Sequence, residues 1–215
     1  MLAALVALLP LALALPGPSG LSISQLKSTG CSASQIAAPL PSNQSTLSVP
    51  AGQKTIYATV GRGVQNYTCT SGTWTNVGAL ANLYDASYLY DLFDSQGLAD
   101  ELPTLAFKYL DYPDTSGLPV KLHHFFVNTP NATSGISAEF ASASNHALFS
   151  KTGSLNAPTN ATINVPWLEL TAIAGQGTLA KTAFRLQTVG GQPPASVSSQ
   201  VGAQADSSAR PKALN

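Results

Sequence analysis

The sequence predicts a mainly β domain, either an antiparallel β-sandwich or a barrel-like fold, that carries a helical insertion. Many short segments alternate apolar and polar residues, and Gly, Pro and Asn separate them, which is typical of an all-β fold. In one stretch, about residues 85–114, apolar residues recur instead with helical spacing. A chain of 215 residues suits one domain with one sizeable core.

The N-terminus predicts secretion. Residues 1–16, MLAALVALLPLALALP, form an apolar run that ends in the small-x-small pattern Ala12-Leu13-Ala14, as in a signal peptide. The run is too short for a membrane span, which needs roughly 20 apolar residues. We therefore expect a secreted, extracellular protein. Residues 17–45, rich in Ser, Pro, Gly and Ala, are expected to form an extended N-terminal segment.

Possible covalent modifications agree with that compartment. Four Asn-x-Ser/Thr triplets, which are acceptors for N-glycosylation, begin at Asn43, Asn66, Asn131 and Asn160. The chain has 2 cysteines, Cys31 and Cys69. A lone pair in an oxidising compartment most often bridges, so we expect a disulfide between them.

A single β-rich domain is predicted over residues 46–194. Its first strands are expected at 46–49, 54–60, 64–69, 73–76 and 77–84, with Gly61 and Gly63 in a turn. Later strands are expected at 122–128, 135–140, 145–150, 163–173 and 179–189, the last two joined by a hairpin turn at Gly175-Gln-Gly177. Across that hairpin Glu169 is expected to meet Lys181 or Arg185. Residues 195–215 have little apolar bulk and are expected to be a disordered tail.

Within the helical insertion, Leu89, Leu92 and Phe93 share one helical face, and a break is expected at Gly97 and Pro103. The insertion also carries many of the acidic residues of the chain. Their spacing matches no calcium loop, so a solvated acidic face is the simplest interpretation, and a site for a cation or a basic partner is the alternative.

Several function classes are excluded or lack a motif. With 10 Lys+Arg against 10 Asp+Glu and no basic cluster, the chain is not expected to bind nucleic acid. It has no Gly-x-Ser-x-Gly nucleophile turn. Gly61-Arg-Gly63 lacks the third glycine of a dinucleotide-binding turn and leads into another strand instead of a helix. No cofactor is expected.

The three histidines are the candidate metal ligands. His123 and His124 are neighbours in a predicted strand, so their side chains point to opposite faces and only one of them could join His146. Together with an acidic side chain, such a pair would support an extracellular hydrolytic or metal-assisted enzyme. The alternative is that all three are structural.

A noncatalytic module that binds a glycan or a surface partner is the leading hypothesis. Exposed Trp74 or Trp167 would stack on sugar rings, although a tryptophan in an apolar strand, such as Trp167, also suits the core. Gln65 and Tyr67 follow the glycine pair and are candidate ligand-site residues. The expected partner is a cell-wall polysaccharide or a surface protein, and an effector that acts on host surfaces is a further possibility. The sequence does not indicate an oligomeric state.

Three parts of the sequence carry a family resemblance. They are Val60-Gly-Arg-Gly-Val-Gln-Asn-Tyr-Thr-Cys69, then Leu122-His-His-Phe-Phe126, then Val165-Pro-Trp-Leu-Glu-Leu170 with Phe184-Arg-Leu-Gln-Thr-Val-Gly-Gly-Gln-Pro-Pro194. Together they resemble a family of secreted fungal proteins, with bacterial relatives, built on a domain of unknown function and sometimes labelled malate dehydrogenase. The resemblance implies no catalytic residues. Dehydrogenase activity is not expected, because a secreted, strand-rich chain without a phosphate-binding turn has no site for the cofactor.

Overall fold

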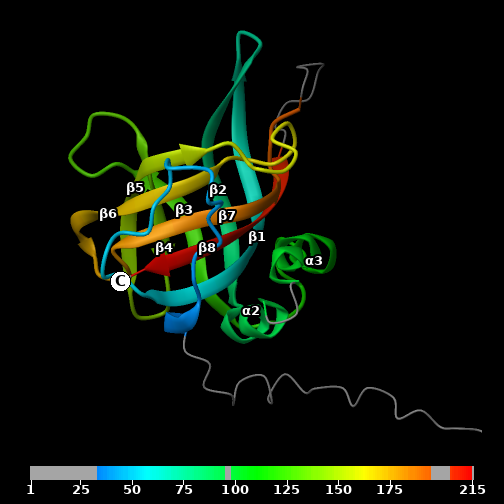
Figure 1. The fold of residues 1–215 in the computed structure, drawn as a ribbon. Helices are drawn as coiled ribbons and strands as arrows, with labels where there is room; N and C mark the ends of the chain where they lie inside the picture. The colour runs from blue at the N-terminus through cyan, green and yellow to red at the C-terminus, as the bar shows by residue number, and fades with distance from the viewer. Residues whose placement is uncertain (1–32, 95–97, 195–203, 215) are drawn as a thin grey trace, which may run out of the picture. The chain divides into compact units, whose positions relative to one another are not determined.

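The structure, a computed structural model, describes residues 33–94, 98–194 and 204–214, with only the backbone described for Leu92 and for 204–214. Seven antiparallel strands curl into one sheet, and an eighth closes it into a barrel (Figure 1). The strands are β1 (Thr55–Thr70), β2 (Thr73–Asp85), β3 (Val120–Asn128), β4 (Ile136–Ala141), β5 (His146–Leu155), β6 (Trp167–Gly177), β7 (Thr182–Gly190) and β8 (Gln204–Leu214). The predicted mainly β class is confirmed, in its barrel-like form.

The closing strand corrects the prediction of a disordered tail. Residues Gln204–Leu214 pair antiparallel with both β1 and β7, so the domain extends beyond the predicted end at residue 194. Strand pairing uses main-chain groups and needs no apolar pattern, and without β8 both neighbours would present free N–H and C=O groups at an open edge. The predicted signal peptide, residues 17–32 and residues 195–203 lie outside the described residues.

Glycines that were predicted to form turns lie inside strands instead. Gly61 and Gly63 lie in the middle of β1, which is one long strand where two were predicted. A Cβ atom at Gly63 would collide with the carbonyl oxygen of Leu80 in β2, so glycine permits the close approach of the two strands. The predicted turn at 175–177 is likewise the end of β6. The predicted strand at 46–49 is not formed.

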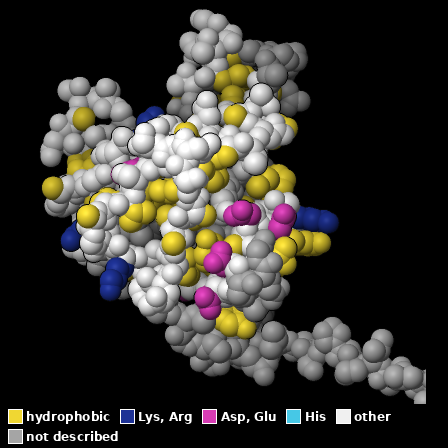
Figure 2. All heavy atoms as spheres, viewed as in Figure 1, with side chains coloured by type: hydrophobic (Ala, Val, Ile, Leu, Met, Phe, Trp, Pro, Cys, Tyr) yellow, Lys and Arg dark blue, Asp and Glu magenta, His cyan; other side chains and the backbone are white. Residues whose placement is uncertain are grey.

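The predicted helical insertion is confirmed and covers the outer face of β1. It comprises α2 (Ser87–Asp94), the 3-10 turn η2 (Ala99–Glu101) and α3 (Leu102–Tyr109), which lie beside the barrel in Figure 1. Tyr90 and Leu102 pack with Ala58 of β1, and Ala106 packs with Val60. Pro103 does not break the helix, because it lies in the first turn, where no N–H is needed. Acidic side chains gather on this side of the molecule (Figure 2).

The N-terminal segment packs on another part of the outer surface. It contains the short 3-10 turn η1 (Ala33–Gln35), and it runs across the outside of the barrel (Figure 1). Leu47, only 2% exposed, packs with Trp167 of β6 and with Phe184 and Leu186 of β7. The neighbours of these residues along each strand point inward, because side chains alternate between the two faces of a sheet. The strands therefore contribute to one apolar cluster inside the barrel and to another outside it.

No helix within the described residues has the length and the apolar character needed to cross a bilayer.

Candidate binding cavity

The barrel contains a cavity of about 440 Å³ that opens to the surface, a volume suited to a small-molecule ligand. Eight-stranded barrels have an interior that is either filled by side chains or able to hold one small ligand. The lining is mostly apolar and comes from strands β1 to β7. Its apolar members include Ala79, Ala81, Leu83, Phe126, Ala138, Phe140, Phe149, Leu168 and Leu170.

Strand alternation places a few polar side chains among these apolar ones. On β3, His124 alternates with Leu122 and Phe126, which also belong to the interior. On β7, Arg185 follows the same alternation as Ala183, while Phe184 packs on the outer face. A cation and an imidazole thereby enter a mostly apolar space.

Arg185 is held by the main chain instead of by an acid. Its Nε and Nη2 atoms donate to the carbonyl oxygen of Pro166 at 3.2 and 2.8 Å. Burial lowers the pKa of Arg185 to about 10, so the guanidinium keeps its charge at neutral pH. The predicted pairing of Glu169 with Lys181 or Arg185 is not found among the described residues: Glu169 accepts a hydrogen bond from the backbone N–H of Ser48 at 2.9 Å. Strands β6 and β7 pair so that Glu169 lies opposite Phe184. Neighbouring side chains in a strand point to opposite faces, so Arg185 points away from Glu169.

His124 is neutral at physiological pH. Burial is the main cause that lowers its pKa to about 4, and the positive charge of Arg185 acts in the same direction. Its Nδ1 lies 3.0 Å from the backbone oxygen of Glu139, and since a carbonyl only accepts, Nδ1 carries the proton. The ring stacks on Phe140 with the centroids 4.4 Å apart.

Two of the predicted ligand-site residues, Gln65 and Tyr67, line the cavity. The Tyr67 hydroxyl donates to the carbonyl oxygen of Gly191 at 2.8 Å, and Gln65 accepts from the amide of Asn76 at 3.2 Å. Burial raises the pKa of Tyr67, which keeps the hydroxyl protonated. These contacts fix the polar groups against the main chain and against each other.

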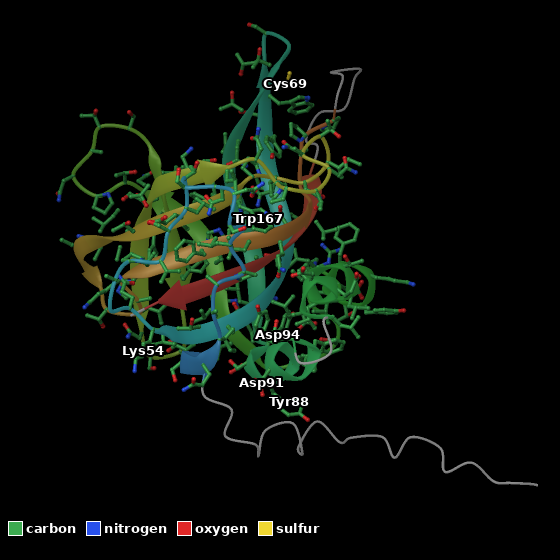
Figure 3. All side chains as sticks on the ribbon, viewed as in Figure 1. Lys54, Cys69, Tyr88, Asp91, Asp94 and Trp167 are labelled. Atoms are coloured by element: carbon green, nitrogen blue, oxygen red, sulfur yellow. The ribbon has the colours of Figure 1, made fainter. Side chains whose placement is uncertain are left out.

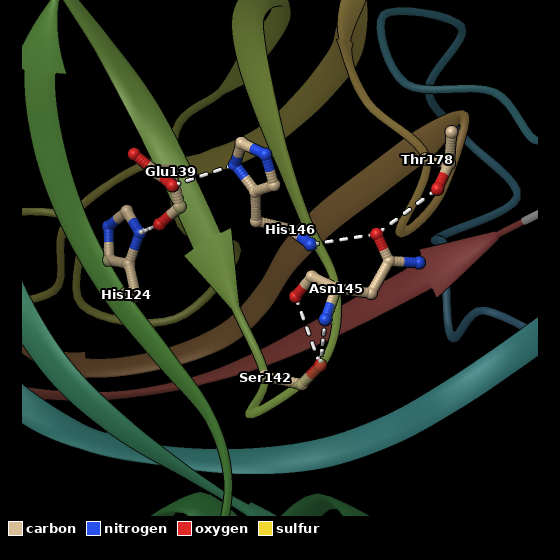
Figure 4. Close-up of polar contacts among 6 residues, drawn as sticks. All are labelled: His124, Glu139, Ser142, Asn145, His146 and Thr178. Atoms are coloured by element: carbon tan, nitrogen blue, oxygen red, sulfur yellow. Dashed lines mark hydrogen bonds and ion pairs between the residues drawn. The ribbon is translucent and has the colours of Figure 1, made fainter.

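The other two histidines, His123 and His146, do not line the cavity. The predicted pairing of His123 or His124 with His146 is not among the contacts of these rings. His123 is exposed, with Nδ1 3.0 Å from Oδ1 of Asn82. His146 places Nδ1 2.9 Å from Oε1 of Glu139, so side chain and backbone of Glu139 contact different histidines (Figure 4). No group of three or more His, Cys, Asp or Glu side chains able to hold a metal ion occurs in the described part of the chain.

Of the two interpretations of Trp167, stacking on a sugar or packing in the core, the structure shows packing. Trp167 is only 8% exposed and belongs to the outer apolar cluster, so its ring is not free to stack on a sugar. Trp74 is half-buried, and its Nε1 is buried without a hydrogen-bond partner. Neither tryptophan lines the cavity.

The predicted disulfide is not formed in the structure. Cys69 is a free, exposed thiol near the tip of the β1–β2 hairpin (Figure 3), and Cys31 lies outside the described residues. Of the glycosylation triplets, Asn43, Asn131 and Asn160 are exposed outside the strands, whereas Asn66 is half-buried in β1.

Sequence reasoning missed the cavity and the role of Arg185. The available signal was a single charged residue inside the apolar run Ala183-Phe-Arg-Leu186. Such a residue indicates either an exposed strand face or a polar group that faces an internal space, and closure of the barrel decides between the two.

A search of curated proteins and a search of solved structures gave no match to this chain. One family does match, over residues 50–209, and the match spans all three parts of the sequence that carry the resemblance noted above. It includes residues of every strand, β8 among them. The chain therefore belongs to the family described as protein of unknown function (DUF3455).

Proposed function

We propose that the protein is a secreted, noncatalytic binding module that holds one small, mainly apolar molecule inside its barrel. The observation that carries the proposal is the cavity of about 440 Å³, lined mostly by aliphatic and aromatic side chains with a few polar groups. Ligand pockets in proteins share this combination of apolar walls and a few fixed polar groups.

The hydrogen bonds in the cavity favour binding over catalysis. The side chains of Arg185, Tyr67 and His124 each bond to a backbone carbonyl oxygen. Acid–base or nucleophilic catalysis needs one side chain to activate another or to be activated by it. Here the polar groups are instead held in place by the strands, as suits the orientation of a ligand.

A neutral fluorescent probe tests this proposal. N-phenyl-1-naphthylamine fluoresces strongly only in an apolar environment, and we expect it to bind with one-to-one stoichiometry. Ala138 lines the cavity and is buried, so Ala138→Phe should fill the space and abolish the signal. Ser150 is exposed on β5 and serves as the matched control, since Ser150→Phe adds a similar ring outside the cavity. Equal fluorescence in both variants would overturn the proposal.

Secretion is supported by the apolar N-terminal run and by the exposure of three glycosylation triplets. The test is expression through a eukaryotic secretory pathway, followed by mass spectrometry before and after removal of N-glycans. We expect glycans at Asn43, Asn131 and Asn160, and little at Asn66, because that side chain is half-buried in a strand. Retention of the chain inside the cell without glycans would refute this part.

A cell-wall polysaccharide or a surface protein remains the partner expected in that compartment. Such a partner is too large for the cavity and would contact the outer surface of the barrel. Pull-down with isolated cell walls, with and without the naphthylamine probe, tests whether the two kinds of binding are independent.

A further inference from the structure

We infer that the ligand of the cavity is an amphipathic carboxylate, a fatty-acid-like molecule whose carboxylate pairs with the Arg185 guanidinium while its chain fills the apolar interior. This inference rests on the proposed function and specifies the ligand class of the same site.

The first argument is the hydrogen-bonding capacity of Arg185. A guanidinium has five N–H donors, and two nitrogens of Arg185 share a single acceptor, the carbonyl oxygen of Pro166. The planar fork can therefore still offer N–H groups to a second acceptor. A carboxylate is the acceptor whose geometry fits such a fork.

The second argument is the charge of the lining. The described residues that line the cavity include the cations Arg185 and Lys151, and none of them is Asp or Glu. Among the described residues, the acidic side chains that lie within ion-pair distance of a basic group are Asp85, beside Lys121, and Glu139, beside His146, and neither lines the cavity. A charge in an apolar space is costly unless it is paired, so an anionic ligand gains more here than a neutral one.

The third argument is that one cavity combines polar and apolar groups. Arg185 donates to the carbonyl oxygen of Pro166, and Tyr67 lies close enough to affect the pKa of Arg185. The aromatic side chains Phe126, Phe140 and Phe149 line the same cavity, and Phe140 stacks on His124. A few polar groups within a larger apolar surface match a molecule with a charged head and a hydrocarbon chain.

The test compares decanoate with decanol, which have the same chain and differ in the charged head. Each competes with the naphthylamine probe at pH 7.5. We expect decanoate to bind about 10- to 100-fold more tightly than decanol, the range expected for a hydrogen bond to a charged group. Equal competition by the two ligands in the wild-type protein would overturn the inference.

Two variants test whether Arg185 causes the preference for decanoate. Arg185→Met should abolish the preference for decanoate and leave decanol binding intact, while Lys54→Met, an exposed cation outside the cavity, should change neither (Figure 3). A preference that survives in Arg185→Met would assign the recognition to another group and refute the inference. If Arg185→Met does not fold, the wild-type comparison still decides.

Two further ligands test the specificity of the cavity for the charged head group. Decyl sulfate distinguishes a carboxylate site from a general anion site, and decyltrimethylammonium should not compete. Failure of the proposed function itself gives a different result, because the neutral probe would then not bind at all.

Discussion

His124 and Arg185 enter the same cavity from β3 and β7, and the charge of Arg185 adds to burial in lowering the pKa of His124 to about 4. Histidine in an unfolded chain has a pKa of about 6.5. The folded protein therefore binds this proton only at lower pH than the unfolded chain does. A neutral imidazole is thus part of the native state.

The first prediction concerns the pH dependence of stability. Between pH 6.5 and pH 4 the unfolded chain takes up the proton and the folded chain does not, so the His124 contribution is present above that window and is lost as the pH falls through it. The loss should amount to no more than about 3 kcal/mol in the free energy of unfolding. Urea unfolding at pH 7.0, 5.5 and 4.5 measures it.

His124→Phe should remove this part of the pH dependence, because it keeps an aromatic ring and removes the titrating group. The exposed His123 gives the control, and His123→Gln should retain the wild-type profile. If His124→Phe and the wild-type protein lose stability in parallel, His124 is not the responsible group.

The second prediction concerns the packing of the N-terminal segment. Leu47→Ala should destabilise the protein by about 2–4 kcal/mol, because Leu47 is 2% exposed between the segment and the outer face of β6 and β7. Val49→Ala is the matched control, since Val49 is 42% exposed, and it should cost less than about 0.5 kcal/mol. Trp167 fluorescence during urea unfolding measures the free energy of unfolding of both variants. Equal costs would show that the segment does not pack on the barrel in solution.

The third prediction concerns Gly63. A methyl group there would meet the carbonyl oxygen of Leu80 and the Cα and Cβ atoms of Ala81, none of which lies on a flexible side chain. Gly63→Ala should therefore lower the melting temperature sharply or prevent folding. Gly72 has a positive φ of 80° with open space around it, so Gly72→Asn should be tolerated. Circular dichroism melts compare the two variants, and similar melting temperatures would contradict the predicted collision.

The fourth prediction concerns Cys69. Because the thiol is free and exposed, it should react with a maleimide reagent in the native protein without denaturant. Peptide mapping of the labelled and unreduced protein identifies the modified residue. A peptide that joins Cys31 to Cys69 would show instead that the disulfide expected from the sequence forms.

Strands β1 to β7 and the helical insertion could be located approximately from the hydropathy pattern, because the alternation of apolar and polar residues reports which side chains are buried. The limits of β1 could not. Gly61 and Gly63 have the local composition of a turn, and only the close approach of β2 shows that a glycine is needed inside the strand. The local composition predicts a turn at these two residues, whereas the contact with β2 is explained only if they lie inside a strand.

The cavity was less predictable than the strands. Gln65 and Tyr67 were candidates because they follow two glycines, yet they line the cavity because they point inward from a continuous strand. Arg185 became visible as a site residue only once barrel closure had fixed the inner face of β7. Closure itself depends on β8, whose main-chain pairing has no apolar signature in the sequence.

The pairing of β8 with β1 has a consequence for how the chain folds during synthesis. The first and the last strand of the barrel are neighbours, so the contacts that close it are among the most distant in the sequence. Strands β1 to β7 can pair as they emerge from the ribosome, but the sheet keeps two open edges until residues 204–214 have been made. Closure of the barrel therefore comes last, and it is slowed by the long-range contacts on which it depends.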